Sequence, residues 1–139
     1  MLRGSFVLLA LLINLTLSVV ACRPSRDAGA PRLATVTRQA GAWQGTGDST
    51  IGFVSDSGRF RIDWQTRNET PAGAGTFRLT VHSAVSGRPI EVIADHRGNG
   101  QGSAEFADAP RVYNFMVEST HVEWSFIVHE VVTVTETPR

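Results

Sequence analysis

Short runs in which apolar and polar residues alternate constrain this chain more than any other feature of its sequence. The runs 60–64 and 76–83 each carry three large apolar residues at every second position. A β-strand points successive side chains to opposite faces, so this period of two predicts strands with one buried face. The large apolar residues on the predicted inward faces are Phe60, Ile62, Trp64, Phe77, Leu79, Val81, Tyr113, Phe115, Trp124 and Phe126.

The spacing of these runs indicates the fold class. From residue 40 onward, glycine interrupts the chain every eight to twelve residues, which is typical of an all-β sandwich or barrel. The connections are short, and this favours antiparallel pairing because parallel strands need longer crossovers. We therefore predict an all-β, antiparallel β-sandwich, jelly-roll or Greek-key like, with seven or eight strands and no helix. The predicted strands are 50–54, 60–64, 76–83, 90–95, 103–106, 111–118, 122–128 and, as an extension or a separate edge strand, 131–135.

The first 21 residues have the composition of a secretory signal peptide. Arg3 precedes a long apolar stretch, and small residues lead to Cys22, the only cysteine. The sequence Val19-Val20-Ala21-Cys22 resembles the lipobox of bacterial lipoproteins. That resemblance implies that residues 1–21 are removed and that the Cys22 thiol carries a diacylglyceryl group. Two alternatives are ordinary cleavage beside an unmodified cysteine and an uncleaved membrane anchor, although 17 residues from Ser5 to Ala21 fall short of the roughly 20 that span a bilayer.

The part after Cys22 divides into a predicted tether and a predicted domain. Residues 22–39 contain two prolines and little apolar pattern, so we expect a flexible tether, or alternatively a short first strand around Leu33, Val36 and Thr37. The segment Arg23–Gln39 has a charge of +3, which either contacts anionic lipid or is incidental. Residues 40–139, the predicted β-sandwich domain, have a charge of −4, so we expect no nucleic-acid partner.

The pattern over residues 47–128 is similar to that of small extracytoplasmic β-sandwich domains on bacterial lipoproteins, a resemblance that supplies no functional residues.

Few residues suggest catalytic or metal chemistry. The four histidines (82, 96, 121 and 129) form no closely spaced pair, so we expect no metal site and no cofactor. The loop 95–102 is rich in glycine and oxygen ligands, but it lacks the spacing of a calcium loop and indicates a hairpin turn instead. A G-x-S-x-G nucleophile motif is absent, and a P-loop is excluded because the chain has no lysine. We therefore predict that the protein is not an enzyme.

One surface is a candidate ligand face. If the runs 60–64 and 76–83 pair with each other, their outward residues lie together on one sheet, where they could contact an anionic polymer or a partner protein. The alternative is that they form the solvated face of a half-buried sheet. Trp43 is a stacking platform for a sugar, or alternatively part of the core or a clasp for the N-terminal segment. The residues of the candidate face are Arg59, Arg61, Asp63, Arg78 and His82.

Together these observations predict a lipid-anchored, non-enzymatic binding module of a bacterial cell envelope. The expected partners are the membrane, through lipid on Cys22, and an envelope protein or glycan. Arg23 after the cysteine resembles the outer-membrane-sorted pattern of Gram-negative lipoproteins; in other hosts we expect the outer face of the cytoplasmic membrane. The alternatives are a carbohydrate- or peptidoglycan-binding module and a small envelope hydrolase.

Overall fold

The computed structural model describes residues 29–137, and these residues form eight β-strands and no helix. The predicted signal peptide and Cys22 lie outside the described residues. The sequence prediction of an all-β, antiparallel sandwich with seven or eight strands is confirmed. The strands are β1 (Arg32–Thr46), β2 (Ser49–Ser55), β3 (Arg59–Arg67), β4 (Thr76–Ser83), β5 (Pro89–Arg97), β6 (Gly100–Ala107), β7 (Arg111–Thr120) and β8 (Glu123–Glu136).

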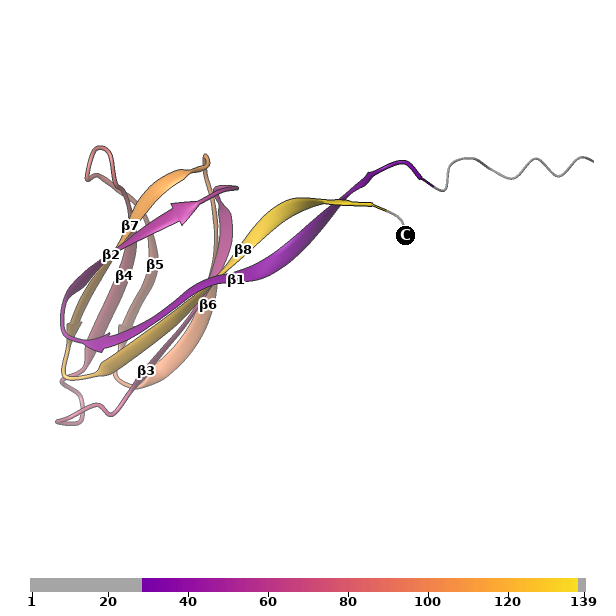
Figure 1. Ribbon diagram of the computed structural model, residues 1–139. Coiled ribbons are helices and arrows are strands. Elements are labelled where there is room, and N and C mark those ends of the chain that lie inside the picture. The colour runs from indigo at the N-terminus through magenta and orange to yellow at the C-terminus, as the bar shows by residue number, and fades with distance from the viewer. Residues whose placement is uncertain (1–28, 138–139) are drawn as a thin grey trace, which may run out of the picture.

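The strands form two four-stranded sheets that face each other (Figure 1). Sheet A has the order β1-β8-β3-β6, and sheet B has the order β2-β7-β4-β5. Strand β1 pairs with β8, β2 with β7, β3 with β6 and β4 with β5, so the chain is one long hairpin folded over on itself. The pairings β3–β8 and β4–β7 join these two-stranded units into sheets. This is the topology of a jelly roll.

The core lies between the sheets and consists of the residues that alternation predicts to face inward. Phe60, Ile62 and Leu79 are buried, as are the other predicted inward residues except Trp64, which is half-buried. Aromatic rings meet across the gap; Phe60, for example, packs edge-on against Phe115 with centroids 5.9 Å apart. Burying one large apolar side chain contributes about 1.5–3 kcal/mol. Burial follows the period of two most clearly in β3, β7 and β8, whereas β5 buries the adjacent residues Ile93 and Ala94, where its pairing with β4 shifts register.

Glycines in sheet A make room for tryptophan rings. A Cβ at Gly102 would lie 2.6 Å from the Trp64 ring, and a Cβ at Gly45 would lie 2.8 Å from the Trp124 ring. Gly102 is a residue of strand β6, whereas the sequence interpretation placed it in the loop 95–102. The observed turn between β5 and β6 is only Gly98-Asn99, and Gly98 has a φ of +76°. Close packing against a ring, His96 for Gly100 and Trp64 for Gly102, rather than chain reversal, explains the glycines beyond this turn.

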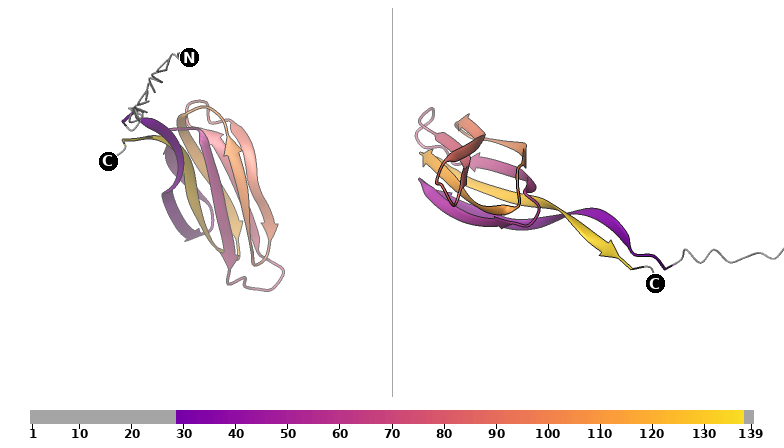
Figure 2. Two further views of the ribbon diagram at one scale, coloured as in Figure 1. Left: turned by 90° about the vertical axis from the view of Figure 1, so that its right-hand side faces the viewer. Right: turned by 90° about the horizontal axis from the view of Figure 1, so that it is seen from above.

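Residues 32–39 differ from the predicted tether. They pair with residues 129–136 of β8 and form a two-stranded ribbon, here called the arm, which projects from the sandwich (Figures 1 and 2). The alternative prediction of a short strand around Leu33, Val36 and Thr37 agrees with this, as does the predicted extension over 131–135. Pairing with the end of β8, and not burial, holds residues 32–39 in strand conformation. Their sequence therefore lacks the apolar alternation that marks a half-buried strand.

Candidate functional site

The outer face of sheet A, here called the polar face, collects polar side chains from all four strands. Residues paired directly across neighbouring strands point to the same side, so the register defines rows. One row runs from Gln44 on β1 through Ser125 on β8 and Gln65 on β3 to Gln101 on β6. We call this row the amide row. Three carboxamides and one hydroxyl thus cross the whole width of the sheet.

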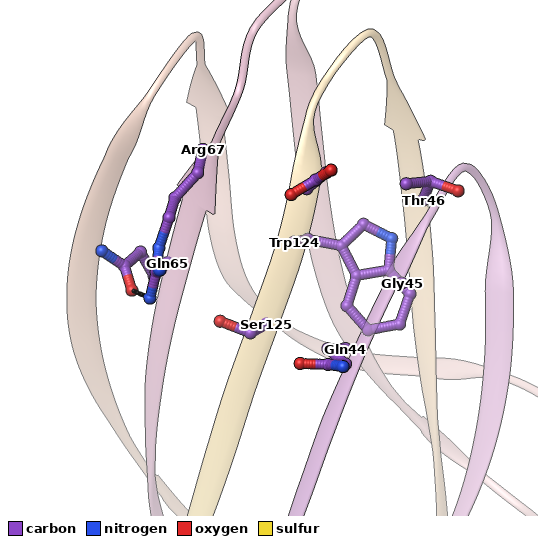
Figure 3. Close-up of a pocket in the computed structure, with 8 residues that line it drawn as sticks. Gln44, Gly45, Thr46, Gln65, Arg67, Trp124 and Ser125 are labelled. Atoms are coloured by element: carbon purple, nitrogen blue, oxygen red, sulfur yellow. Dashed lines mark hydrogen bonds between the residues drawn. The ribbon is translucent and has the colours of Figure 1, made fainter.

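Two hollows flank Gln65 and Arg67 on this face. The first, of about 370 Å³, lies between β1, β8 and β3, where Figure 3 shows Gln44, Ser125 and Gln65 on three neighbouring strands. The second, of about 460 Å³, lies over β3 and β6 and includes Gln101. Arg67 donates a hydrogen bond to the Gln65 side chain, so the two residues form a ridge between the hollows.

Charged residues border the amide row at the end of the sheet. Glu123 is paired in register with Thr46 and with Arg67. Its carboxylate accepts a hydrogen bond of 2.7 Å from the Asn68 side chain, which belongs to the β3–β4 connection. Asn68 adopts a positive φ of 55°, a conformation that asparagine tolerates better than most residues. The border at this end therefore carries both signs of charge.

Asp63 is the centre of a second polar cluster, one row further along the face. Its carboxylate accepts a hydrogen bond of 2.7 Å from Ser103 and contacts Arg61 and His129, each at 3.2 Å. The Ser103 hydrogen bond, followed by the positive charge of Arg61, lowers the pKa of Asp63 below its usual 3.8, although partial burial opposes this. Asp63 is therefore a carboxylate at neutral pH.

The Asp63 cluster contains serine, histidine and aspartate, but not in the arrangement of a hydrolase triad. In a triad the histidine lies between serine and aspartate, so that it can remove the serine proton. Here Asp63 lies in the middle and binds both Ser103 and His129. The Ser103 hydroxyl donates a hydrogen bond to the Asp63 carboxylate. Because the pKa of Asp63 is lowered, this carboxylate is a weak base and does not activate the hydroxyl as a nucleophile.

The predicted ligand face is split between the two sheets. Strands β3 and β4 do not pair, because β3 belongs to sheet A and β4 to sheet B. Arg59, Arg61 and Asp63 lie on the polar face, whereas Arg78 and His82 lie on the outer face of sheet B, on the opposite side of the sandwich. The prediction that these five residues form one cluster is therefore wrong. Their strands are consecutive in sequence, but the connection between them crosses from one sheet to the other.

Other singled-out residues have structural surroundings. Trp43 packs against Phe126 with ring centroids 5.3 Å apart and also against Phe53 and Phe115, so it belongs to the edge of the core. The His96 ring lies against Trp64. Within residues 29–137, no three His, Cys, Asp or Glu side chains gather as a metal site would require. The same residues include no helix with the length and apolar character to cross a bilayer.

Sequence reasoning missed the amide row. The available signal was that its four members stand at outward positions of alternating strands: Gln44, Gln65, Gln101 and Ser125. Only the strand order and register show that they form one line.

The fold and this face define a jelly-roll β-sandwich with a polar sheet surface. Known protein families provide no match to the sequence, and neither do curated proteins. Among solved structures, the chain is similar to the CBM22-1 and GH10 modules of endo-1,4-β-D-xylanase 10B from Clostridium thermocellum, solved with xylohexaose. The similarity has a TM-score of 0.40 at 14% identity and covers 56% of this chain and 17% of that one. The chain thus spans a small part of the xylanase, and a likeness at this level says nothing about function.

Proposed function

We propose that this protein is a non-enzymatic binding module of the bacterial cell envelope, anchored by lipid on Cys22, that binds glycan on the polar face. The amide row between the two hollows carries the proposal. The lipobox resemblance supports the anchor and the location, and the position of Asp63 between Ser103 and His129 supports a role without catalysis.

The chemistry of the amide row favours a neutral ligand. A carboxamide and a hydroxyl can each donate and accept hydrogen bonds. Sugar hydroxyl and N-acetyl groups have the same dual capacity, so a glycan lying across the strands can be contacted at each one. The charges along the borders of the row have both signs, Arg67 beside Glu123 and Arg61 beside Asp63, which gives no preference for a strongly anionic polymer.

The composition of the polar face also suggests a modest affinity. The exposed large apolar residues of 29–137 are aliphatic, with no aromatic ring among them, so stacking contributes little. Four hydrogen-bonding side chains at about 1 kcal/mol each correspond to a Kd of roughly 1 mM per site. A protein partner is less suited to this face, because protein interfaces usually centre on buried aromatic or arginine anchors.

Binding to purified peptidoglycan tests the proposal. Co-sedimentation of the protein with the insoluble polymer should fall several-fold in Gln65→Ala combined with Gln101→Ala. The matched control is Asn114→Ala, an amide truncation on the outer face of sheet B, which should sediment like the unsubstituted protein. If the double variant binds as well as the control, or if soluble glycan fragments do not compete, the glycan assignment is wrong.

A further inference from the structure

Most of the arm has only two strands. Strand β3 pairs with β8 as far as Phe60, which lies opposite Glu130, and from Val131 onward β8 pairs only with β1. The six residue pairs beyond this point, 32–37 with 131–136, extend about 20 Å at the usual rise per residue. A ribbon of two strands is marginally stable by itself in water, so a further strand or a covering surface would stabilise it.

One face of the arm continues the buried face of sheet A without a second sheet opposite it. Ala34 and Val36 on β1 lie beside Val132 and Val134 on β8. Val36 and Val134 are each 37% exposed although they continue the inward rows of the core. The described part of the chain therefore leaves an apolar ribbon face uncovered.

Among the residues that the structure describes, no strand pairs with the outer edge of β1 along the arm. In the described residues, the backbone hydrogen bonds recorded for positions 32–39 are those with β8. Natural proteins usually protect such an edge with lysine, proline or a bulge, but Leu33-Ala34-Thr35-Val36-Thr37 is uncharged and rich in β-branched residues. Unpaired N–H and C=O groups in a row are satisfied best by another strand.

We propose that this strand is β1 of a second copy, paired antiparallel about a two-fold axis near Thr35. The two arms would then form one four-stranded sheet in the order β8-β1-β1-β8. Leu33 would lie opposite Thr37 of the second copy, and Ala34 opposite its Val36. An isologous pairing needs a segment that is compatible with itself, and this uncharged segment meets that condition.

The charges at the two ends of the segment favour a second copy in this register. Arg38 is held by Asp56 at 2.7 Å and by Glu130 at 3.1 Å, so this cluster has a net charge of −1. In the proposed register, Arg32 of one copy lies opposite Arg38 of the other and therefore meets an acidic cluster rather than an isolated arginine. The same contact forms twice, once at each end of the shared segment.

The pairing has a consequence for ligand binding that rests on the proposed function. A two-fold axis perpendicular to the shared sheet keeps both polar faces on the same side of it. Two weak sites on one assembly can bind one polymer together, which raises the effective affinity without any new contact. The pairing itself does not depend on the ligand, so either proposal can fail alone.

Disulfide trapping of the full-length chain in its own membranes tests the pairing. Cysteines facing each other in neighbouring antiparallel strands have Cα atoms about 4.5–5.5 Å apart, within the range of a disulfide. Under mild oxidation, Thr35→Cys should give a dimer with twice the mass of the monomer in the same membranes, and this dimer should disappear on reduction. Thr133→Cys is the matched control, because Thr133 pairs with Thr35 but lies one strand further from the axis. The unsubstituted chain controls for Cys22.

A dimer from Thr35→Cys but not from Thr133→Cys supports the proposal, provided that both variants keep the thermal midpoint of the unsubstituted chain. No dimer, equal dimer from both positions, or a cross-link to a protein of another mass overturns it, and the last result would mean a different strand partner. As a second measurement, Arg32→Glu should reduce the trapped Thr35→Cys dimer roughly three-fold, whereas Arg88→Glu should leave it unchanged.

Discussion

Glu130 gives the sharpest prediction about what holds the arm to the sandwich. Its side chain is 1% exposed, at the root of the arm. One carboxylate oxygen accepts hydrogen bonds from the Ser55 hydroxyl at 2.6 Å and from the Ser57 backbone N–H at 3.1 Å, and the other accepts from Arg38. Ser55 ends β2 and Ser57 lies in the turn before β3, so this carboxylate ties the turn to β8. We expect Glu130→Gln to weaken this connection.

The size of the effect follows from the hydrogen bonds. A hydrogen bond to a charged group contributes about 1.5–3 kcal/mol and a neutral one about 1 kcal/mol. Glutamine can still accept from Ser55 and Ser57, but as a neutral group, and its amide N–H₂ would face the Arg38 donors. We therefore expect a loss of about 2 kcal/mol in the free energy of unfolding, which for a domain of this size lowers Tm by roughly 8 °C.

The same substitution should change the acid dependence of stability. Burial alone would raise the pKa of Glu130, but the hydrogen bonds from Ser55, Ser57 and Arg38 outweigh it, so the pKa lies below its usual 4.5. A carboxyl whose pKa is lowered by folding contributes stability above its unfolded pKa and loses that contribution as pH falls through the folded value. The difference in unfolding free energy between the unsubstituted protein and Glu130→Gln should therefore be constant at neutral pH and shrink below about pH 4.5.

Urea unfolding at a series of pH values measures this difference directly. Asp63 and Asp108 also have lowered pKa values, but they are present in both proteins and cancel in the comparison. The control is Glu118→Gln, which neutralises an exposed carboxylate on sheet B and should change little. If Glu130→Gln is as stable as the control, or if its deficit does not shrink in acid, Glu130 does not hold the turn in the way described.

Three further predictions concern the core, the turns and the anchor. Trp124→Ala should cost about 3–5 kcal/mol because the ring is 4% exposed, and Trp64→Ala should cost less because its ring is half-buried; equal losses in urea unfolding would contradict this packing. Gly47 and Gly58 both have φ near +70°, so Gly47→Ala, in open space, should cost about 1–2 kcal/mol. Gly58→Ala should cost about 1–3 kcal/mol more, because its Cβ would lie 2.1 Å from the Asp108 carbonyl oxygen; equal thermal midpoints would refute this. Cys22→Ser should move the protein from the membrane pellet to the soluble fraction, and retention in the pellet would favour an uncleaved anchor.

Local sequence pattern was sufficient to predict the buried side of the strands that alternate strictly. Phe60 and Ile62 alternate with charged residues, and both are buried. The alternation in 76–83 likewise predicted the buried positions Phe77 and Leu79. These assignments succeed because the two faces of a strand follow from backbone geometry alone.

The neighbours of each strand could not be predicted in the same way. Strand β3 lies between β8 and β6, whose sequences begin more than thirty residues later, and pairing over such a distance depends on the whole topology. For that reason Arg78 was wrongly grouped with Arg61, and the amide row was not recognised. The glycines Gly100 and Gly102 were interpreted as loop residues because their role is to accommodate rings from other strands.

Mapping the ligand contact on the protein tests the central claim most directly. Backbone amide resonances of the isotope-labelled protein would be followed during titration with soluble peptidoglycan fragments. Saturable shifts are expected at Gln44, Gln65, Gln101 and Ser125, with a Kd of about 1 mM and no comparable change on the outer face of sheet B. Shifts centred on Arg78 and His82, or no shifts at concentrations well above that Kd, would contradict it.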